Sequence, residues 1–294
     1  MRIVVAGGSG FLGRPLIRTL KSAGHDVTQL VRRPVVKPDQ LRWDPAEPVT
    51  LPEDTAAVIN LCGVNIGHRW TPSYRRELRD SRVVPTTTLA KAVAAQGIEL
   101  LINSSGVGSY GDTGQTEVTE ESPALTGEDF LSRLSVEWEG ATRPAADAGA
   151  RVVLMRTGLP LSTDGGFLKP QLLPFKLGVG GKLGDGKQWV PWVSFIDWLR
   201  AVQFVIGDKE IDGPLNIVGP NPVTNAQFTK ELGKALHRPT FMFVPKVAVR
   251  VLYGEYANEG YRSLRVKPQV LLSRGFRFEH ATVDRALRAA LSSR

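Results

Sequence analysis

The clearest chemical signature in the chain is a glycine-rich turn near its start, Gly7-Gly8-Ser9-Gly10-Phe11-Leu12-Gly13. Glycines at the spacing of Gly7, Gly10 and Gly13 let a strand turn sharply, let the backbone approach a pyrophosphate and let the next helix pack tightly on a sheet. The turn follows an apolar strand-like stretch, residues 3–6, and precedes a stretch with helical spacing, which is the context this motif requires. We therefore predict a dinucleotide site in which the helix presents free N–H groups to the phosphates, with the contacts made by Gly7, Gly10, Phe11, Leu12 and Gly13.

The end of the second predicted strand indicates which dinucleotide is bound. NAD sites place an acidic residue there for the ribose hydroxyl, whereas this chain has Arg32 and Arg33 and no acidic residue until Asp39. A planar guanidinium can pair bidentately with the 2′-phosphate of NADP, so we predict NADP(H) as the cofactor. The alternative is that both arginines are solvated surface residues.

Strand-like and helix-like stretches alternate through the first 160 residues. This alternation predicts βαβ units, and hence an α/β fold with a Rossmann-type, doubly wound parallel sheet. The expected strands are residues 3–6, 27–31, 57–61, 99–103 and 151–156, and the expected helices are residues 11–23, 73–95 and 129–148.

The pattern changes after Gly158, where residues 163–187 are rich in glycine and predict loops. We expect residues 1–160 to form the NADP-binding domain, with residues 190–218 returning to it. Residues 161–189 and 219–294 would then form a smaller α+β C-terminal lobe on the substrate side. In that lobe we expect helices at 225–236, 247–253 and 268–273 and a strand at 241–244. Asp197 is expected to cap the helix that follows it.

Composition excludes several other classes of protein. The 294 residues are 42% hydrophobic and 22% charged, with a net charge of +8 that is spread out rather than gathered into blocks. No recognition motif accompanies this charge, so we expect no nucleic-acid partner. No long apolar run or signal peptide is present, so we expect no membrane partner and a cytoplasmic location. The four histidines show no metal-ligand spacing and Cys62 is the one cysteine, so we expect no metal.

The chain resembles the extended, epimerase-like branch of the short-chain dehydrogenase/reductase superfamily, also called the NAD-dependent epimerase/dehydratase superfamily. Besides the glycine turn, residues 101–105 followed by Tyr110-Gly111 are similar to its segment of a strand, serines and Tyr-Gly. Further segments resemble an atypical subgroup of uncharacterised members with a C-terminal domain of unknown function: Asp80-Ser81-Arg82, Phe130-Leu131, Trp138-Glu139, Arg156-Thr157-Gly158, Asp164-Gly165-Gly166, Gly178-Val179-Gly180-Gly181, Gln188-Trp189, residues 220–225 and Gly275-Phe276-Arg277-Phe278.

The resemblance implies a set of cofactor neighbours beyond the glycine turn: Arg32, Arg33, Leu61, Cys62, Glu77, Arg82, Arg156 and Leu159. Gly63, next to Cys62, and Ser104 complete the expected set. Two of these residues also have simpler interpretations. Cys62 lies in an apolar run and is typical of a small buried residue, and Glu77 with Arg82 could form a solvated helix face.

One feature departs from the superfamily. Its members use Tyr-x-x-x-Lys, in which the tyrosine is the general acid/base and the lysine lowers its pKa. None of the five tyrosines here has lysine four residues later; those positions hold Leu78, Gly114, Ala257, Gly260 and Arg265. The residues that normally transfer the proton are therefore missing.

Tyr110 and Ser105 are the best replacements that the sequence offers. Tyr110 follows the serine-bearing strand and could transfer a proton, and Ser105 could orient a substrate carbonyl. The alternatives are that Tyr110 packs or stabilises a loop and that Ser104 and Ser105 bond a turn or the cofactor. Trp189 and Trp192, after the glycine-rich segment, could belong to a substrate lid or to the core of the small lobe.

These observations favour an NADP(H)-dependent oxidoreductase acting on an unidentified small molecule. A non-catalytic NADP(H) sensor or regulatory protein is the main alternative, because the Tyr-x-x-x-Lys motif is absent. Epimerisation or dehydration with tightly held cofactor is a third possibility, and it needs a strong base that the sequence does not show. A homodimer is possible by analogy with the superfamily alone.

Overall fold

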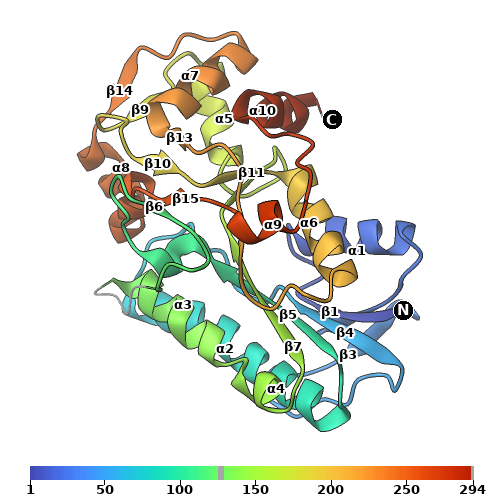
Figure 1. Cartoon of the computed structure of the whole chain (residues 1–294). Coiled ribbons are helices and arrows are strands. Elements are labelled where there is room, and N and C mark those ends of the chain that lie inside the picture. Colours follow the sequence, from blue (N-terminus) through green and yellow to red (C-terminus); the bar gives the residue numbers. More distant parts are fainter. Residues whose placement is uncertain (125–128, 293–294) are drawn as a thin grey trace.

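The core of the molecule is a parallel sheet of seven strands. The computed structural model describes residues 1–124 and 129–292, and it places these strands in the order β12-β7-β5-β4-β1-β2-β3 (Figure 1). All six neighbouring pairs are parallel. Their bounds are β1 (Arg2–Ala6), β2 (Asp26–Val31), β3 (Gln40–Arg42), β4 (Thr55–Asn60), β5 (Leu100–Gly106), β7 (Arg151–Thr157) and β12 (Gly213–Ile217). The predicted Rossmann-type doubly wound sheet is confirmed.

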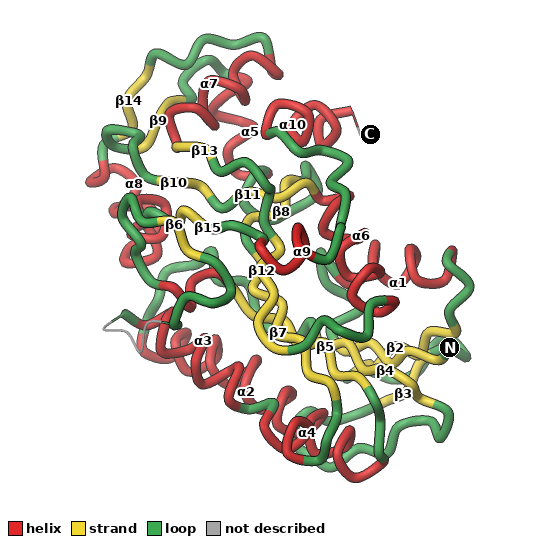
Figure 2. The backbone as a smooth tube through the Cα atoms, in the orientation of Figure 1, coloured by secondary structure: helices red, strands yellow, loops and turns green. Residues whose placement is uncertain are grey.

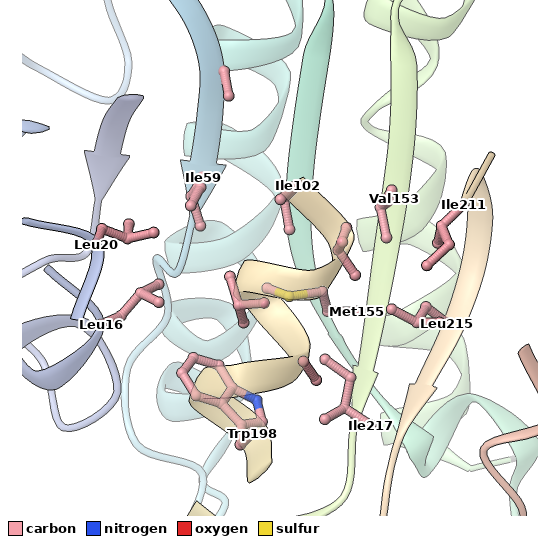
Figure 3. Close-up of a cluster of buried hydrophobic side chains, with 14 of the residues drawn as sticks. Leu16, Leu20, Ile59, Ile102, Val153, Met155, Trp198, Ile211, Leu215 and Ile217 are labelled. Carbon is pink, nitrogen blue, oxygen red and sulfur yellow. The ribbon is translucent and has the colours of Figure 1, made fainter. Parts of the chain in front are cut away.

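Helices cover both faces of this sheet, because its central strands are apolar on both sides. One face packs against α1 (Gly13–Ser22) and α6 (Phe195–Gly207). Figure 3 shows this layer, where Trp198 of α6 lies among side chains of the sheet such as Met155 of β7 and Ile217 of β12. The other face packs against α2 (Pro72–Gln96), with α3 (Phe130–Gly140) and α4 (Arg143–Asp147) beside it.

The strand order reverses beside β1. Strands β2 and β3 follow on one side of β1, and β4 begins the series on the other side, with Val5 level with Ile59. In open α/β sheets, ligands bind at this switch point, beyond the carboxyl ends of the strands. The ends of β1 and β4, at Ala6 and Asn60, therefore locate the expected site.

The C-terminal half adds short strands and helices beyond the carboxyl edge of the sheet (Figure 2). Its larger elements are α5 (Lys169–Lys176), α7 (Asn225–Leu236), α8 (Lys246–Tyr253), α9 (Gln269–Ser273), α10 (Val283–Ser292), and the 3-10 helix η2 (Gly254–Tyr261). Its strands are β8 (Leu159–Leu161), β9 (Gly181–Leu183), β10 (Trp189–Val190), β11 (Trp192–Ser194), β13 (Val223–Thr224), β14 (Met242–Val244) and β15 (Arg265–Val266), which pairs with β6 (Glu117–Val118).

Two expectations about local structure were wrong. The helix expected at 129–148 is two helices, because Pro144 cannot donate a helical hydrogen bond and stands in the first turn of α4. The segment 163–187, expected to be rich in loops, also contains α5. Asp197 does not cap α6, whose N-cap is Ser194. The buried carboxylate of Asp197 instead accepts hydrogen bonds from the backbone amides of Glu279 and His280 at 2.8 and 2.9 Å.

Among the residues that the structure describes, no helix is long and apolar enough to cross a membrane. The division into residues 1–160 with 190–218, against 161–189 with 219–294, remains an interpretation.

Candidate cofactor and substrate site

The glycine turn fits closely between β1 and its neighbours. Gly7 has φ +76°, and a Cβ there would stand 2.6 Å from the carbonyl carbon and oxygen of Leu61. A Cβ on Gly13 would stand 2.4 Å from the carbonyl oxygen of Gly7, and one on Gly10 would stand 3.2 Å from the same atom. Side chains at these positions would push the turn away from the sheet, so glycine is needed for the close packing of strand, turn and helix.

The start of α1 is open to an anion. Its N-cap is Leu12, which makes no side-chain capping hydrogen bond, and its first turn holds no acidic residue. The first N–H groups of a helix need acceptors, and they carry the positive end of the helix dipole. The N-terminus of α1, at the switch point of the sheet, can therefore hold a phosphate.

A loop from the C-terminal half lies over this turn. Gly165 and Gly166 lie against the ring of Phe11, and a Cβ on Gly165 would stand 2.7 Å from that ring. The ring of Phe11 also packs 5.3 Å from that of Phe195 in α6. Phe11 therefore joins the nucleotide turn to the glycine-rich segment.

Arg32 and Arg33 follow directly after β2 and are exposed. No ion pair is found for either among residues 1–124 and 129–292. The charge of Arg32 acts on the thiol of Cys62, so Arg32 lies near the end of β4 as well as that of β2. Both guanidinium groups are thus free to bind an anionic group beside the glycine turn.

Cys62 is expected to be chemically inert. Burial raises the pKa of its thiol to about 12, although the charge of Arg32 opposes this shift. Because the thiolate is the reactive form, we expect iodoacetamide to modify Cys62 at pH 8 at least about 100-fold more slowly than it modifies free cysteine. Mass spectrometry of the native protein, with the unfolded protein as the control, measures this rate. Native labelling as fast as in the unfolded chain would contradict the assignment.

Arg82 is buried, and it holds the segment that follows β4. Its guanidinium donates to the carbonyl oxygens of Leu78 and Val64 at 3.0 Å each, lies 5.2 Å above the ring of Trp138 and closely approaches Gly63. Burial lowers its pKa to about 10. The solvated-face alternative is therefore wrong for Arg82. The solvated-face alternative fits Glu77, which is exposed on another face of α2.

A buried polar network that we did not predict joins the ends of β4 and β5. Asn60 donates to Asn103 at 2.7 Å and to Thr86 of α2 at 2.8 Å, and the indole of Trp138 donates to Thr86 at 2.9 Å. Asn60 also accepts from the amide of Cys62 at 3.0 Å, which fixes the course of the chain after β4. The available signal was an asparagine at the end of each of two apolar strands.

Ser105 belongs to a buried ion-pair network rather than to an open surface. Its hydroxyl donates to Glu139 Oε1 at 2.6 Å, and Arg156 donates to both oxygens of Glu139 at 2.9 and 2.8 Å. Burial alone would lower the pKa of Arg156, but the hydrogen bonds and charge of Glu139 outweigh this effect and raise it. Ser104, by contrast, is half-buried. Leu159, another expected cofactor neighbour, begins β8.

Tyr110 is 2% exposed and packs with Val107, Val218 and Leu264. Its hydroxyl donates to Asn216 Oδ1 at 2.9 Å, and Arg156 lies 4.8 Å above its ring. Burial raises the pKa of the phenol. The packing alternative fits this placement better than the role of proton donor, which stays an untested prediction.

The two tryptophans differ in placement. Trp192 is 1% exposed in the core of the small lobe, as the core alternative expects. Trp189 is half-buried, donates to Gln115 at 2.9 Å and lies under the guanidinium of Arg265. A lid formed by Trp189 stays a prediction.

A parallel sheet with a glycine turn and an uncapped helix at its switch point defines a dinucleotide-binding, Rossmann-type protein. Comparison with known families agrees with this class. Residues 3–218 match the NAD dependent epimerase/dehydratase family, and residues 244–290 match a domain of unknown function, DUF1731. The chain belongs to the NAD dependent epimerase/dehydratase family, as the sequence motifs predicted.

Relatives cover nearly the whole chain. "Epimerase family protein Mb2239" of Mycobacterium bovis is 46% identical over 290 residues, which are 97% of this chain and 96% of that protein. Human "Epimerase family protein SDR39U1" is 36% identical over 98% of this chain and 99% of its own length. A crystal structure of human SDR39U1 (isoform 2) with NADPH has a TM-score of 0.92, with 33% identity over 99% of this chain and 100% of that one.

Proposed function

We propose that this chain binds NADP(H) and uses it to transfer a hydride to or from a small molecule. The observation that carries the proposal is the open N-terminus of α1 above a turn that only glycine fits, at the switch point of the sheet. The crystal structure of human SDR39U1 with NADPH supports the choice of cofactor. The residues of this chain fit such a cofactor, because the turn leaves no Cβ in its path and α1 begins there with no side-chain cap and no acidic residue in its first turn.

The free arginines after β2 support NADP(H) over NAD(H). Arg32 and Arg33 stand where an acidic residue would receive the ribose hydroxyl of NAD. Two guanidinium groups at this place favour a phosphate on that hydroxyl and offer nothing comparable to the hydroxyl itself. Gly63, shortly after β4, and the buried Arg82 of α2 would form the adjoining part of the cofactor site.

The nicotinamide group supplies a hydride when it is bound, so the chain itself must supply a place for the substrate and a proton. The ends of β5 and β7 lie next to one another, with Ser105 level with Arg156. The buried pair of Arg156 with Glu139 makes this edge rigid. Half-buried Ser104, rather than Ser105, is the serine of this strand that remains available to a ligand.

Replacing both Arg32 and Arg33 by alanine tests the cofactor assignment. We expect the double variant to bind NADPH about 100-fold more weakly and NADH almost unchanged, because each charge-assisted bond to the phosphate contributes about 1.5–3 kcal/mol. Fluorescence titration with each cofactor measures both affinities. The control, Arg277→Ala with Arg285→Ala, removes the same charge from two exposed arginines of the C-terminal half. Parallel losses for NADPH and NADH would contradict the assignment.

A non-catalytic NADP(H) sensor remains the second candidate function. The observation that favours it concerns the expected catalytic pair. The hydroxyl of Ser105 donates to Glu139 and that of Tyr110 donates to Asn216, so neither proton is directed at a ligand. A sensor predicts tight NADPH binding without consumption of NADPH by aldehydes, ketones, imines or enones. An enzyme predicts consumption with at least one of these classes.

A further inference from the structure

A cluster of charged side chains lies where several loops meet beyond the carboxyl edge of the sheet. It consists of Asp129, the N-cap of α3, with Glu259 of η2 and Arg262 directly after η2. The 3-10 helix η2 is held by the loop after β4 through Trp70, whose ring packs 5.8 Å from that of Tyr256. The glycine-rich segment holds it from the other side, through a 3.2 Å hydrogen bond from Gln188 to the carbonyl of Gly260.

Arg262 is the centre of this cluster, and only one of its two terminal nitrogens has partners among the described residues. Its side chain is 10% exposed. Its Nη2 lies 2.9 Å from Asp129 Oδ1 and 3.2 Å from Glu259 Oε1. Its Nη1 is buried and has no hydrogen-bond partner among the described residues. Leaving such a donor unpaired is costly, so Nη1 is suited to an acceptor that residues 1–124 and 129–292 do not supply.

The missing side chain of Gly108 leaves room for about a methyl group beside this nitrogen. A Cβ on Gly108 would stand 4.0 Å from Arg262 Nη1 and 3.7 Å from the Cβ of Leu131. The φ of Gly108 is not in the left-handed region, so its backbone does not require glycine. Gly108 belongs to the 3-10 helix η1 (Val107–Tyr110), directly after β5 with its two serines. Gly108 therefore lies at the carboxyl edge of the sheet, where ligands of such folds bind.

The charges around Glu259 favour its protonated form. Burial raises its pKa to about 7; Arg262 opposes this, whereas Asp129, Glu255 and Asp112 raise it further. Because Glu255 is itself paired with Arg75, Asp129 and Asp112 remain against the one guanidinium of Arg262. A site with this balance disfavours an anionic ligand, although the chain as a whole carries a charge of +8.

We propose that Asp129, Glu259, Arg262 and the space beside Gly108 form the substrate site, and that it takes an uncharged carbonyl compound. Arg262 Nη1 donates to the carbonyl oxygen, and protonated Glu259 gives that oxygen its proton. Nη2 of the same guanidinium lies 3.2 Å from Glu259 Oε1, so one side chain would hold both the carbonyl oxygen and the Glu259 carboxyl. This proposal rests on the proposed hydride-transfer function, and it gives Glu259 the role that the missing tyrosine has in the superfamily.

The reaction balances with the groups named. The carbonyl carbon gains a hydride from NADPH, which becomes NADP⁺, and the C=O π bond breaks. The oxygen takes the proton of Glu259, so the product is an alcohol and Glu259 is left as a carboxylate. A proton from water then restores Glu259. In the reverse direction, the Glu259 carboxylate takes the proton of the alcohol.

The test uses the full chain with NADPH and benzaldehyde as the uncharged test compound. We expect Glu259→Gln to lower kcat by about 100-fold or more, as for loss of a general acid, with NADPH affinity unchanged. In the wild type, kcat should fall about tenfold for each pH unit above the pKa of Glu259, and this dependence should vanish in the variant. Glu279→Gln is the control, because it removes an exposed carboxylate that is not among the groups acting on Glu259; its kcat should stay within about threefold of the wild type.

A second variant separates a substrate role from a structural one. Gly108→Ala adds a methyl group at ordinary contact distances, so the protein should keep its Tm while the KM for benzaldehyde rises about tenfold, the effect of about 1.4 kcal/mol. NMR of isotope-labelled glutamate side chains gives a readout without turnover. Benzaldehyde should move the Glu259 signal, identified by its loss in Glu259→Gln, and its para-carboxylate derivative should not.

Three results would overturn the proposal: kcat of Glu259→Gln within threefold of the wild type, an unchanged KM in Gly108→Ala, or a Glu259 signal that benzaldehyde does not move. Its failure differs from failure of the proposed function. If both variants turn over benzaldehyde like the wild type, hydride transfer stands and the cluster is structural. If the wild type binds no NADPH, the proposed function itself fails.

Discussion

Gly13→Ala is expected to weaken NADPH binding by about 100-fold or more, which corresponds to about 3 kcal/mol of binding free energy. The new Cβ would stand 2.4 Å from the carbonyl oxygen of Gly7 and 2.6 Å from the Cα of Gly8. Both neighbours are backbone, so neither can move aside as a side chain would. The start of α1 must then shift away from β1, and its N–H groups leave the position in which they can meet a phosphate.

Two further variants distinguish this effect from general damage. Gly10→Ala places a Cβ 3.2 Å from the same oxygen, a tighter contact than usual but not an overlap, so we expect a smaller loss of about tenfold. Gly140→Ala, at the end of α3, meets nothing within 4 Å and should bind NADPH like the wild type. Circular dichroism checks that each variant is folded. Wild-type affinity in folded Gly13→Ala would contradict the role of the turn.

Glu139→Ala is expected to lower the free energy of unfolding by about 3–5 kcal/mol, the usual cost of removing one partner of a buried ion pair. The side chains of Arg156 and Glu139 are 5% and 10% exposed. Without Glu139, the guanidinium of Arg156 stays buried without a counter-ion, and Ser105 loses its acceptor. Thermal unfolding should show a Tm lower by about 10 °C or more.

The chain provides a matched control two residues away. Glu137 pairs with Arg79, and the two side chains are 42% and 46% exposed, so Glu137→Ala should cost less than about 1 kcal/mol. Adding Arg156→Leu to Glu139→Ala should restore much of the lost stability, because the unpaired buried charge is then gone. Equal Tm losses in the Glu137 and Glu139 variants would show that burial of the pair does not matter.

The sequence predicts the sheet well because its central strands are long and apolar. The stretch at 3–6 falls within β1, and those at 57–61 and 99–103 fall largely within β4 and β5. Each has the composition of a buried parallel strand. By contrast, β10, β13 and β15 have two residues each. Strands of this length carry no periodicity, since their pairing depends on which distant segments the fold brings together. The sequence did not predict the helix α5, because α5 contains prolines, including Pro174 in its interior, and glycines lie on both sides of it.

The residues of the site likewise fall into those marked by a local sequence pattern and those that only the fold brings together. The glycine turn could be found because its function depends on local spacing. The pair of Glu139 with Arg156 joins α3 to β7, and the pair of Asp129 with Arg262 joins residues 133 positions apart in the chain. No local pattern marks such a pair. The sequence favours Tyr110 as the proton donor because it follows the serine-bearing strand. It does not show that the Tyr110 hydroxyl donates to Asn216 in the interior.

Titration of the purified wild-type chain with NADPH and with NADH, followed by nicotinamide fluorescence, tests the central claim most directly. The account predicts saturable binding of NADPH and at least about tenfold weaker binding of NADH, because Arg32 and Arg33 favour the extra phosphate. Tighter binding of NADH would contradict the role given to these arginines. Absence of saturable binding by either dinucleotide would contradict the assignment of the glycine turn and the function built on it.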